Sequence, residues 1–252
     1  MALFSRWIRW NVTLCDAIEE RLPVAFTRSL LHLHELTVAD AINARSGVRL
    51  LDVGGGHFSP FASRRIPERR AFLIGADIWE EGIRGNKAVD ARVVADACRG
   101  LPFRDGSMDV VSTRSVMEHL PDNARFLAEC YRILTRGGVA ICVMPSRRSP
   151  FAWFNRLLPE KTKRKLLFSL FPEWRDTCGF RAYYDRCAWP EMRQAFEAAG
   201  FAVERFELRY YQSIYCKFFV PLFLVSLVYD FVLWSLSARR LCSQIFIVAR
   251  RK

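Results

Sequence analysis

The first half of the chain alternates short, continuously apolar runs with stretches of helical periodicity. Strands that are covered on both faces form continuous apolar runs, whereas helices place apolar residues three and four positions apart. Apolar runs of the first kind occupy residues 48–56, 71–78, 91–97, 108–115 and 139–146. The pattern predicts an α/β fold, in which a doubly wound and mostly parallel sheet is covered by helices.

Further elements follow from the same periodicities. Residues 121–138 predict a helix, with Pro121 in its first turn and Gly137–Gly138 at its end. The elements predicted beyond it are a helix and two strands, at residues 189–200, 202–210 and 243–251.

Composition narrows the partners and the compartment. The 252 residues carry a formal net charge of +12, which favours phosphates, nucleic acid or an acidic membrane surface as partners. Eight cysteines are scattered without a C-x-x-C pair or a spacing that would hold zinc. We therefore expect reduced thiols, no metal and a cytoplasmic protein. The N-terminus has no apolar run of signal-peptide length, so we expect no secretion.

Glycines and acidic residues follow the predicted strands, at the edge of the sheet where such folds bind ligands. A glycine turn at residues 54–56 lets the backbone bend sharply and lets a ligand approach it. Asp77, about 20 residues beyond that turn, is placed to accept hydrogen bonds from ribose hydroxyls. Asp96 follows the next strand. Ser59 stands where the dinucleotide fingerprint G-x-G-x-x-G requires a third glycine, which disfavours an NAD site.

Together these segments resemble a class I S-adenosylmethionine-dependent methyltransferase of the small-molecule kind, similar to methyltransferase type 11. The resemblance rests on LLDVGGGHF, IGADI, VVADACRGLPFRDGSMDVVSTRSVMEHL and LAECYRILTRGGVAICVMPS, and covers roughly residues 48–146. It implies S-adenosylmethionine as cofactor, with its ribose on Asp77, its adenine amino group on Asp96 and its sulfonium near Ser115. The cofactor-binding residues that the resemblance implies are Asp52, Gly54, Gly55, Gly56, Asp77, Ile78, Asp96, Ala97 and Ser115.

Two features depart from family patterns. Phe58 stands where the family usually has a third glycine, and together with His57 it is expected to narrow the turn. Residues 112–115 lack the Asn/Asp-Pro-Pro-aromatic loop by which methyltransferases of exocyclic base amino groups resemble one another. Base methylation is therefore disfavoured, and we expect no nucleic-acid partner despite the charge.

The acceptor side carries fewer signals. Because a sulfonium is already a strong methyl donor, the protein mainly has to align the acceptor with the methyl group and exclude water. A hydroxyl acceptor is also helped by a base, and His119 in MEHL is the candidate, with a packing or capping role as the alternative. Tyr183 and Tyr184 are predicted to line the acceptor side, with core packing as the alternative.

The predicted methyltransferase domain, residues 47–252, follows an N-terminal helical segment at residues 1–46 and carries two insertions. The basic and aromatic insertion at 147–178 fits either a membrane-surface or anionic-ligand element or a solvated lid. The apolar insertion at 214–240 contains the run 218–238, which approaches the length of a membrane span.

A single bilayer crossing by this apolar run conflicts with the resembled fold. There, the last two strands pair as an antiparallel hairpin, so both ends of the run return to one domain. Pro221 would also disturb the first turns of a spanning helix, and Asp230 is costly at mid-bilayer. The sequence predicts instead a pair of short helices that dip into one leaflet or cover the active-site mouth. Burial in a homodimer interface or in the protein's own core is the alternative.

The sequence therefore predicts a cytoplasmic S-adenosylmethionine-dependent methyltransferase that is peripheral to a membrane and O-methylates a lipid-linked or otherwise amphiphilic acceptor. One alternative is a soluble methyltransferase for a small acidic metabolite, with the apolar insertion as a lid or dimer surface. The other is a non-catalytic binding module that keeps the fold.

Overall fold

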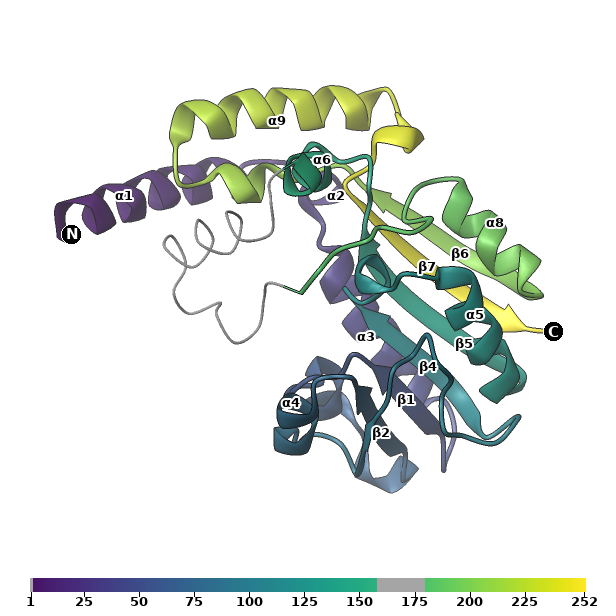
Figure 1. The fold of residues 1–252 in the computed structure, drawn as a ribbon. Coiled ribbons are helices and arrows are strands. Elements are labelled where there is room, and N and C mark those ends of the chain that lie inside the picture. The colour runs from purple at the N-terminus through teal and green to yellow at the C-terminus, as the bar shows by residue number, and fades with distance from the viewer. Residues whose placement is uncertain (1, 158–179) are drawn as a thin grey trace.

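A seven-stranded sheet forms the centre of the protein (Figure 1). The computed structural model describes residues 2–157 and 180–252. In chain order the strands are β1 (Arg49–Val53), β2 (Phe72–Asp77), β3 (Ala91–Val94), β4 (Met108–Arg114), β5 (Leu134–Pro145), β6 (Phe201–Arg209) and β7 (Gln244–Arg251). They lie in the order β3-β2-β1-β4-β5-β7-β6, with β7 antiparallel to both neighbours and the other pairs parallel. The predicted mostly parallel sheet with a C-terminal antiparallel hairpin is confirmed.

Helices cover both faces of this sheet and extend beyond it. In chain order they are α1 (Ala2–Glu19), α2 (Val24–Thr27), α3 (Leu30–Asn43), α4 (Glu80–Gly85), α5 (Asn123–Ile133), α6 (Pro150–Leu157), α8 (Glu191–Ala198) and α9 (Val220–Ser235). Short 3-10 turns are η1 (Pro60–Arg64), η2 (Pro67–Arg69), η3 (Met117–His119), η5 (Ser213–Cys216) and η6 (Arg239–Leu241). The predicted basic, aromatic insertion is described only as far as Leu157, and residues 158–178 of it lie outside the described part of the chain.

Alternate residues of the central strands enter two cores, one on each face of the sheet. Leu50 of β1 packs in the core that contains Ile42 of α3. Its neighbour Leu51 packs in the other core, which contains Phe126 of α5 and Phe196 of α8. Because successive side chains of a strand point to opposite faces, a strand covered on both faces is apolar throughout. This explains why the central strands could be located from their apolar runs.

Two helical connections start at the edge of the sheet where the parallel strands end. α6 follows β5, and α9 joins β6 to β7. β6 runs in the same direction as β5, because both are antiparallel to β7. Arg209 at the end of β6 pairs with Gln244 at the start of β7, so the connection between them leaves and returns at one point. Figure 1 shows α9 beyond the strand ends, where it contacts α1.

The helix predicted over residues 121–138 is shorter in the structure. Asp122 caps it, since its side chain accepts a hydrogen bond from the backbone of the third helical residue, and α5 ends at Ile133. The next residue already pairs with Met108 of β4, so β5 begins where the helix stops. A Cβ on Gly138 would lie 2.9 and 3.0 Å from two backbone carbonyl oxygens. The prediction that the glycines end the helix is therefore wrong: Gly138 permits close strand approach instead.

The apolar run 218–238 contains one 16-residue helix, α9, and the predicted pair of short helices is wrong. Pro221 lies in the first turn, where its missing N–H costs nothing, so the helix starts there without disturbance. Asp230 is fully buried in the protein, where it accepts hydrogen bonds from the backbone and side chains of Gln212 and Ser213. Within the described residues, no helix combines the length and apolar character that crossing a bilayer requires.

Polar contacts hold α1 against the start of α9. The backbone N–H of Val220 donates to Oδ1 of Asn11 at 3.0 Å. Lys217 forms ion pairs with Asp16, at 2.6 Å, and with Glu19. The first helix of the chain and the last are therefore fastened to one another, although the proposed division between residues 1–46 and 47–252 stays a prediction.

Candidate functional site

The glycine turn after β1 has a backbone that other residues would strain. Gly54 has a φ of +75°, and a Cβ there would lie 2.1 Å from Cγ2 of Val116. Its N–H donates to the carbonyl of Ala76 at 2.7 Å. The turn is therefore pressed between the ends of β2 and β4, and only glycine fits at its first position.

A buried polar cluster holds this turn in place. Oδ2 of Asp52 accepts a hydrogen bond of 2.6 Å from Ser59, and the side-chain amide of Asn86 donates to the carbonyl of Gly55 at 3.0 Å. Burial raises the pKa of Asp52 to about 7, against the opposing effect of hydrogen bonds from Ser59 and Ser112. Asp52 therefore shapes the turn from beneath. Sequence reasoning did not find Ser59 or Asn86 in this role, because isolated polar residues carry no spacing signal.

Asp77, at the end of β2, is joined directly to the glycine turn. The N–H of Gly56 donates to Oδ2 of Asp77 at 2.9 Å, and the N–H of Trp79 donates to Oδ1 at 2.8 Å. An ionised carboxylate has about four acceptor sites, so each oxygen can still accept from a hydroxyl. Ile78 exposes its side chain beside this carboxylate. The carboxylate of Asp77 could accept hydrogen bonds from a diol, and the side chain of Ile78 could pack against a flat ring attached to it.

Asp96 lies on the next loop along the sheet. The N–H of Ala95 donates to the main-chain carbonyl of Asp77 at 3.0 Å, which sets the two loops side by side. Oδ1 of Asp96 accepts from the N–H of Cys98 at 2.9 Å, and Ala97 is buried between them. The structure thus brings together the glycine turn, Asp77 and Asp96, as the sequence predicts.

The loop after β4 carries the next two predicted residues. Ser115 has a φ of +55°, a left-handed conformation that is strained for a residue with a Cβ, and its N–H donates to the carbonyl of Val143 at 2.9 Å. Nδ1 of His119 lies 2.9 Å from the carbonyl oxygen of Arg181. Because a carbonyl only accepts, Nδ1 carries the hydrogen, and the lone pair of the neutral ring lies on Nε2. This tautomer suits a base.

Aromatic rings link the loops around the site. The rings of His57 and Trp79 lie 5.8 Å apart, those of Trp79 and Phe180 6.5 Å, and those of Phe180 and His119 6.1 Å. These residues come from the glycine turn, the loop after β2, the segment that contains Tyr183, and η3. The site therefore has an aromatic rim that sequence reasoning missed, since its members are distant in the chain.

The two predicted acceptor-side tyrosines occupy different environments. Tyr184 is buried in the core, whereas Tyr183 has 43% of its surface exposed. The backbone N–H groups of both donate to the carbonyl of Glu118, at 2.9 and 2.8 Å. Placement in the core favours the packing alternative for Tyr184, so Tyr183 is the better acceptor-side candidate.

Glu118 is a buried acid that the sequence reading overlooked. Burial raises the pKa of its carboxyl to about 8, and its Oε2 has no hydrogen-bond partner among the described residues. It is next to His119, with 3.9 Å between its Oε1 and Nε2 of that histidine. Its position in MEHL, between a core methionine and the histidine, was visible, but the sequence did not reveal its burial.

Comparison with protein families finds a match to a methyltransferase domain over residues 51–142. A Mycolicibacterium smegmatis protein described as a probable S-adenosylmethionine-dependent methyltransferase is 33% identical over 145 residues, covering 52% of this chain and 55% of that one. The 27-O-demethylrifamycin SV methyltransferase of Amycolatopsis mediterranei is 36% identical over 110 residues, covering 40% of each chain. The chain thus spans about half the length of the curated relatives it matches.

Solved structures share the fold at lower identity. An S-adenosylmethionine-dependent methyltransferase from Mesorhizobium loti has a TM-score of 0.54 and 16% identity, covering 86% of this chain and 98% of that one. A phosphoethanolamine N-methyltransferase from Haemonchus contortus, in complex with a phosphomonomethylethanolamine and S-adenosylhomocysteine, has a TM-score of 0.53 and 18% identity, covering 86% and 52%.

Proposed function

We propose, from the premise that residues 51–142 form a class I S-adenosylmethionine-dependent methyltransferase domain, that the protein methylates an acceptor held at the carboxyl edge of its sheet. When bound, S-adenosylmethionine supplies an electrophilic methyl group on a sulfonium. Asp77 would accept hydrogen bonds from the ribose hydroxyls, Ile78 would cover one face of the adenine, and Asp96 would accept a hydrogen bond from its amino group. The glycine turn admits the methionine portion beside the main chain.

The hydrogen bond from Gly56 to Asp77 is the observation that carries this proposal. This bond holds the carboxylate of Asp77 against the glycine turn. In the proposal, the carboxylate that accepts the hydroxyls and the backbone that the ligand approaches therefore form one surface. Asp77 is only partly buried, and its remaining acceptor sites match a vicinal diol. The donor and acceptor set therefore fits a nucleoside better than it fits a helix cap.

For a hydroxyl acceptor, His119 takes the proton that the acceptor oxygen loses on methylation. The hydrogen bond to Arg181 keeps the hydrogen on Nδ1, so that Nε2 receives the acceptor's proton. The aromatic rim, from His57 to Phe180, excludes water from the acceptor oxygen as it becomes the ether oxygen.

The acceptor in this proposal is an amphiphile that the protein meets at an anionic membrane surface. α9 buries only a narrow stripe, and apolar side chains project from the rest of the helix, with Val225 69% exposed and Val228 64% exposed. A helix that is apolar on nearly all sides normally lies inside a protein or against lipid. Arginines flank this surface and complement anionic head groups; those exposed on α1 and η6 are Arg6, Arg9, Arg239 and Arg240.

The test uses methyl-labelled S-adenosylmethionine with separate membrane-lipid and soluble extracts of the source. Label is expected in the lipid extract with the wild-type protein and not with Asp77→Ala. Asp40→Ala, which removes an exposed carboxylate from α3, is the matched control and is expected to retain transfer. Label only in the soluble extract would replace the amphiphile by a soluble acceptor. Absence of cofactor binding, or binding that Asp77→Ala leaves unchanged, would reject the enzyme in favour of a binding module.

A further inference from the structure

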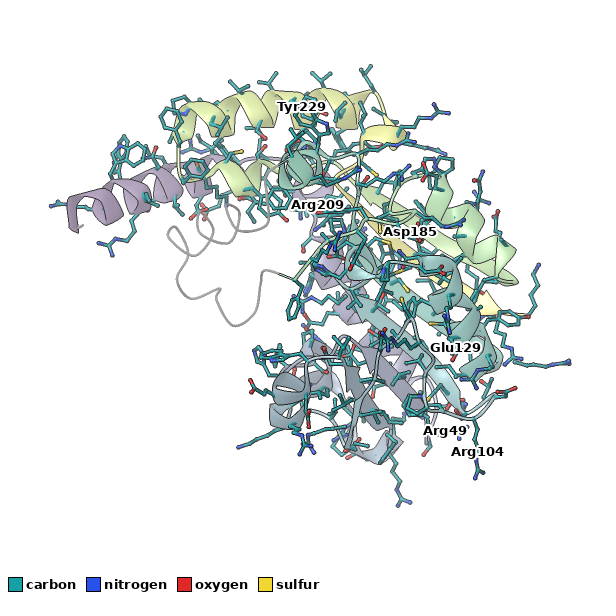
Figure 2. The ribbon with its side chains drawn as sticks, in the orientation of Figure 1. Arg49, Arg104, Glu129, Asp185, Arg209 and Tyr229 are labelled. Atoms are coloured by element: carbon teal, nitrogen blue, oxygen red, sulfur yellow. The ribbon has the colours of Figure 1, made fainter. Side chains whose placement is uncertain are left out.

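A cleft of about 630 Å³ lies between α6 and α9, where the chain leaves β5. Arg147, Arg148 and Arg156 supply guanidinium groups to it, while Trp153 and Tyr229 supply aromatic rings. Figure 2 shows Tyr229 on α9 above α6. Guanidinium groups bind phosphate and carboxylate through paired N–H donors, and exposed aromatic rings cover apolar chains. The lining thus suits a molecule with an anionic group and an apolar body.

The charge in this cleft is unbalanced. Arg147 and Arg148 share one oxygen of Glu191, at 2.7 and 3.0 Å. Arg156 is exposed and has no ion-pair partner within residues 2–157 and 180–252. Among the described residues of the cleft, three guanidinium groups against one carboxylate leave a formal charge of +2. Each guanidinium has five N–H donors, so the pair on Glu191 can still bind a second anion.

The neighbouring hollow behind Arg147 lacks this imbalance. It is about 430 Å³ and is lined by Arg147 and Arg186 together with Asp185 and Glu191, which cancel formally. Of the two hollows, as the described residues line them, formal charge therefore favours an anion in the one that faces α9. Of the two hollows, the one facing α9 combines a net positive charge with an apolar wall.

The backbone that carries the arginines is fastened from both sides. The N–H of Ser146 donates to the carbonyl of Ser243 at 2.8 Å, and the N–H of Arg147 donates to the carbonyl of Cys187 at 2.6 Å. Fixing the main chain lowers the entropy cost of ordering the arginines around a ligand.

The cleft opens onto the apolar surface of α9. Trp153 is 61% exposed at its rim, and Leu241 of η6 is also exposed there. Tyr229 belongs both to the cleft and to α9, about one turn from the exposed Val225 and about two turns from the exposed Leu236. An apolar chain attached to an anion in the cleft would therefore lie against α9 without crossing a polar barrier.

We propose that this cleft binds the phosphate group of a lipid phosphoester, whose hydrocarbon chain lies along α9. The inference rests on the proposed amphiphilic acceptor and gives that acceptor a chemical class. A phosphate monoester carries close to two negative charges at neutral pH, which matches the formal charge of the cleft. A neutral amphiphile would fill the apolar wall and leave the arginines without an anion.

Direct binding to the full-length protein tests the inference without methyl transfer. The probes are dihexanoyl phosphatidic acid below its micelle concentration, inorganic phosphate, and a neutral short-chain diacylglycerol, measured by calorimetry. Arg148→Gln/Arg156→Gln removes two charges from the cleft. Arg69→Gln/Arg104→Gln removes two exposed arginines elsewhere, and Figure 2 shows Arg104 far from α9.

We expect the cleft variant to weaken phosphatidic acid binding about tenfold or more, a loss of about 1.4 kcal/mol or more in binding free energy, because two guanidinium groups no longer contact the phosphate. The control variant should weaken binding by less than about twofold. Inorganic phosphate and the diacylglycerol should each bind more weakly than phosphatidic acid. Equal weakening by both variants would overturn the proposal in favour of general electrostatic attraction. Phosphate binding as tightly as the lipid would overturn it in favour of a free-anion site, and absence of lipid binding would overturn it outright.

Cofactor binding to the same proteins separates this proposal from the proposed function. Asp77→Ala should lose S-adenosylmethionine and keep phosphatidic acid, while the cleft variant should do the reverse. A wild-type protein that binds the cofactor and no phosphatidic acid contradicts the lipid inference alone. One that binds phosphatidic acid and no cofactor contradicts the methyltransferase alone.

Discussion

Oδ2 of Asp230 in α9 accepts a hydrogen bond of 2.9 Å from the backbone N–H of Ser213, which precedes that helix by a short turn. The same oxygen accepts from the hydroxyl of Ser213 at 2.7 Å and from the N–H of Gln212 at 2.7 Å. Burial raises the pKa of this carboxyl, while these donors lower it. The lone acid of the apolar run therefore fastens α9 to the end of β6 and does not face lipid.

Asp230→Ala should destabilise the protein by about 2–4 kcal/mol, because buried backbone N–H groups lose their acceptor. Urea denaturation checks this. Ser226→Ala removes a neighbouring hydroxyl that bonds to Ser213 and to the thiol of Cys216, and should cost less than about 1.5 kcal/mol. Equal stability of Asp230→Ala and the wild type would mean that water replaces the carboxylate.

Gly54→Ala should abolish or greatly weaken cofactor binding, because a Cβ there collides with Val116 and the backbone has a positive φ. Gly85→Ala is the matched control, since no atom lies within 4 Å of the Cβ it adds. Titration with S-adenosylmethionine, together with circular dichroism to verify folding, measures the effect. Comparable affinities for the two variants would contradict the close approach of the turn to the strand-four loop.

Glu118→Gln should change how stability depends on pH. With its pKa raised to about 8, the folded protein keeps a proton between about pH 4.5 and pH 8 that the unfolded chain has released. The unfolding free energy of the wild type therefore falls across this window, by up to about 1.4 kcal/mol per pH unit from this group. The variant lacks that contribution, so its stability should gain on the wild type as pH rises.

Two other buried groups also make the unfolding free energy depend on pH, so the quantity to compare is the difference in unfolding free energy between wild type and Glu118→Gln at each pH. Asp52, with a pKa raised to about 7, contributes in the same direction, whereas His34, with a pKa lowered to about 4, contributes the opposite slope below about pH 6.5. Both are present in wild type and variant, so they cancel in the difference. Parallel stability curves from about pH 5 to pH 8 would show that Glu118 is not buried as a neutral acid.

His119→Gln should lower kcat by roughly 10²–10⁴-fold if a hydroxyl is methylated, since the proton acceptor is lost. Affinity for S-adenosylmethionine should stay within about twofold, because the proposed role of His119 is toward the acceptor and not toward the cofactor. Initial rates with the identified acceptor give the first quantity and calorimetry the second. An unchanged kcat would assign His119 a packing role beside Phe180.

Val225→Glu/Val228→Glu should reduce flotation with anionic liposomes severalfold, because two charges then face the acyl region. Both side chains are exposed, so thermal stability should change little. Ile66→Glu, at an exposed position before β2, is the control and should float like the wild type. A wild-type protein that stays at the bottom of the gradient and runs as a tight dimer would replace the membrane by a second copy.

The signals for the proposed cofactor site are local in the sequence. Asp52, Asp77 and Asp96 stand at the ends of continuous apolar runs, which are typical of strands covered on both faces. The three strands concerned, β1, β2 and β3, are neighbours in the sheet. The acceptor half depends on contacts between distant segments. The sequence around Glu118 does not reveal that the backbone of Tyr183 and Tyr184 will bond to its carbonyl. Likewise, the sequence around Arg148 does not reveal that α9 will form the other side of its cleft.

Two predictions about helices were wrong because contacts between distant segments outweighed the local sequence signal. Gly137–Gly138 predicts a helix end, but pairing with β4 had already ended the helix at Ile133. Pro221 and Asp230 suggest an interrupted helix, but the first lies in the opening turn and the second has donors on its buried side.

The pairing of Arg209 with Gln244 makes the apolar connection between them, residues 210–243, a segment that can be exchanged as a unit. Its two ends meet at one point of the sheet, so its length and composition can change without moving a strand. The residues proposed to bind the cofactor all precede it, and the matched domain also ends before it, at residue 142. Evolution, or a chimera that exchanges residues 210–243 with the equivalent segment of another such enzyme, could thus alter where the protein works and what it modifies while leaving the methyl donor untouched.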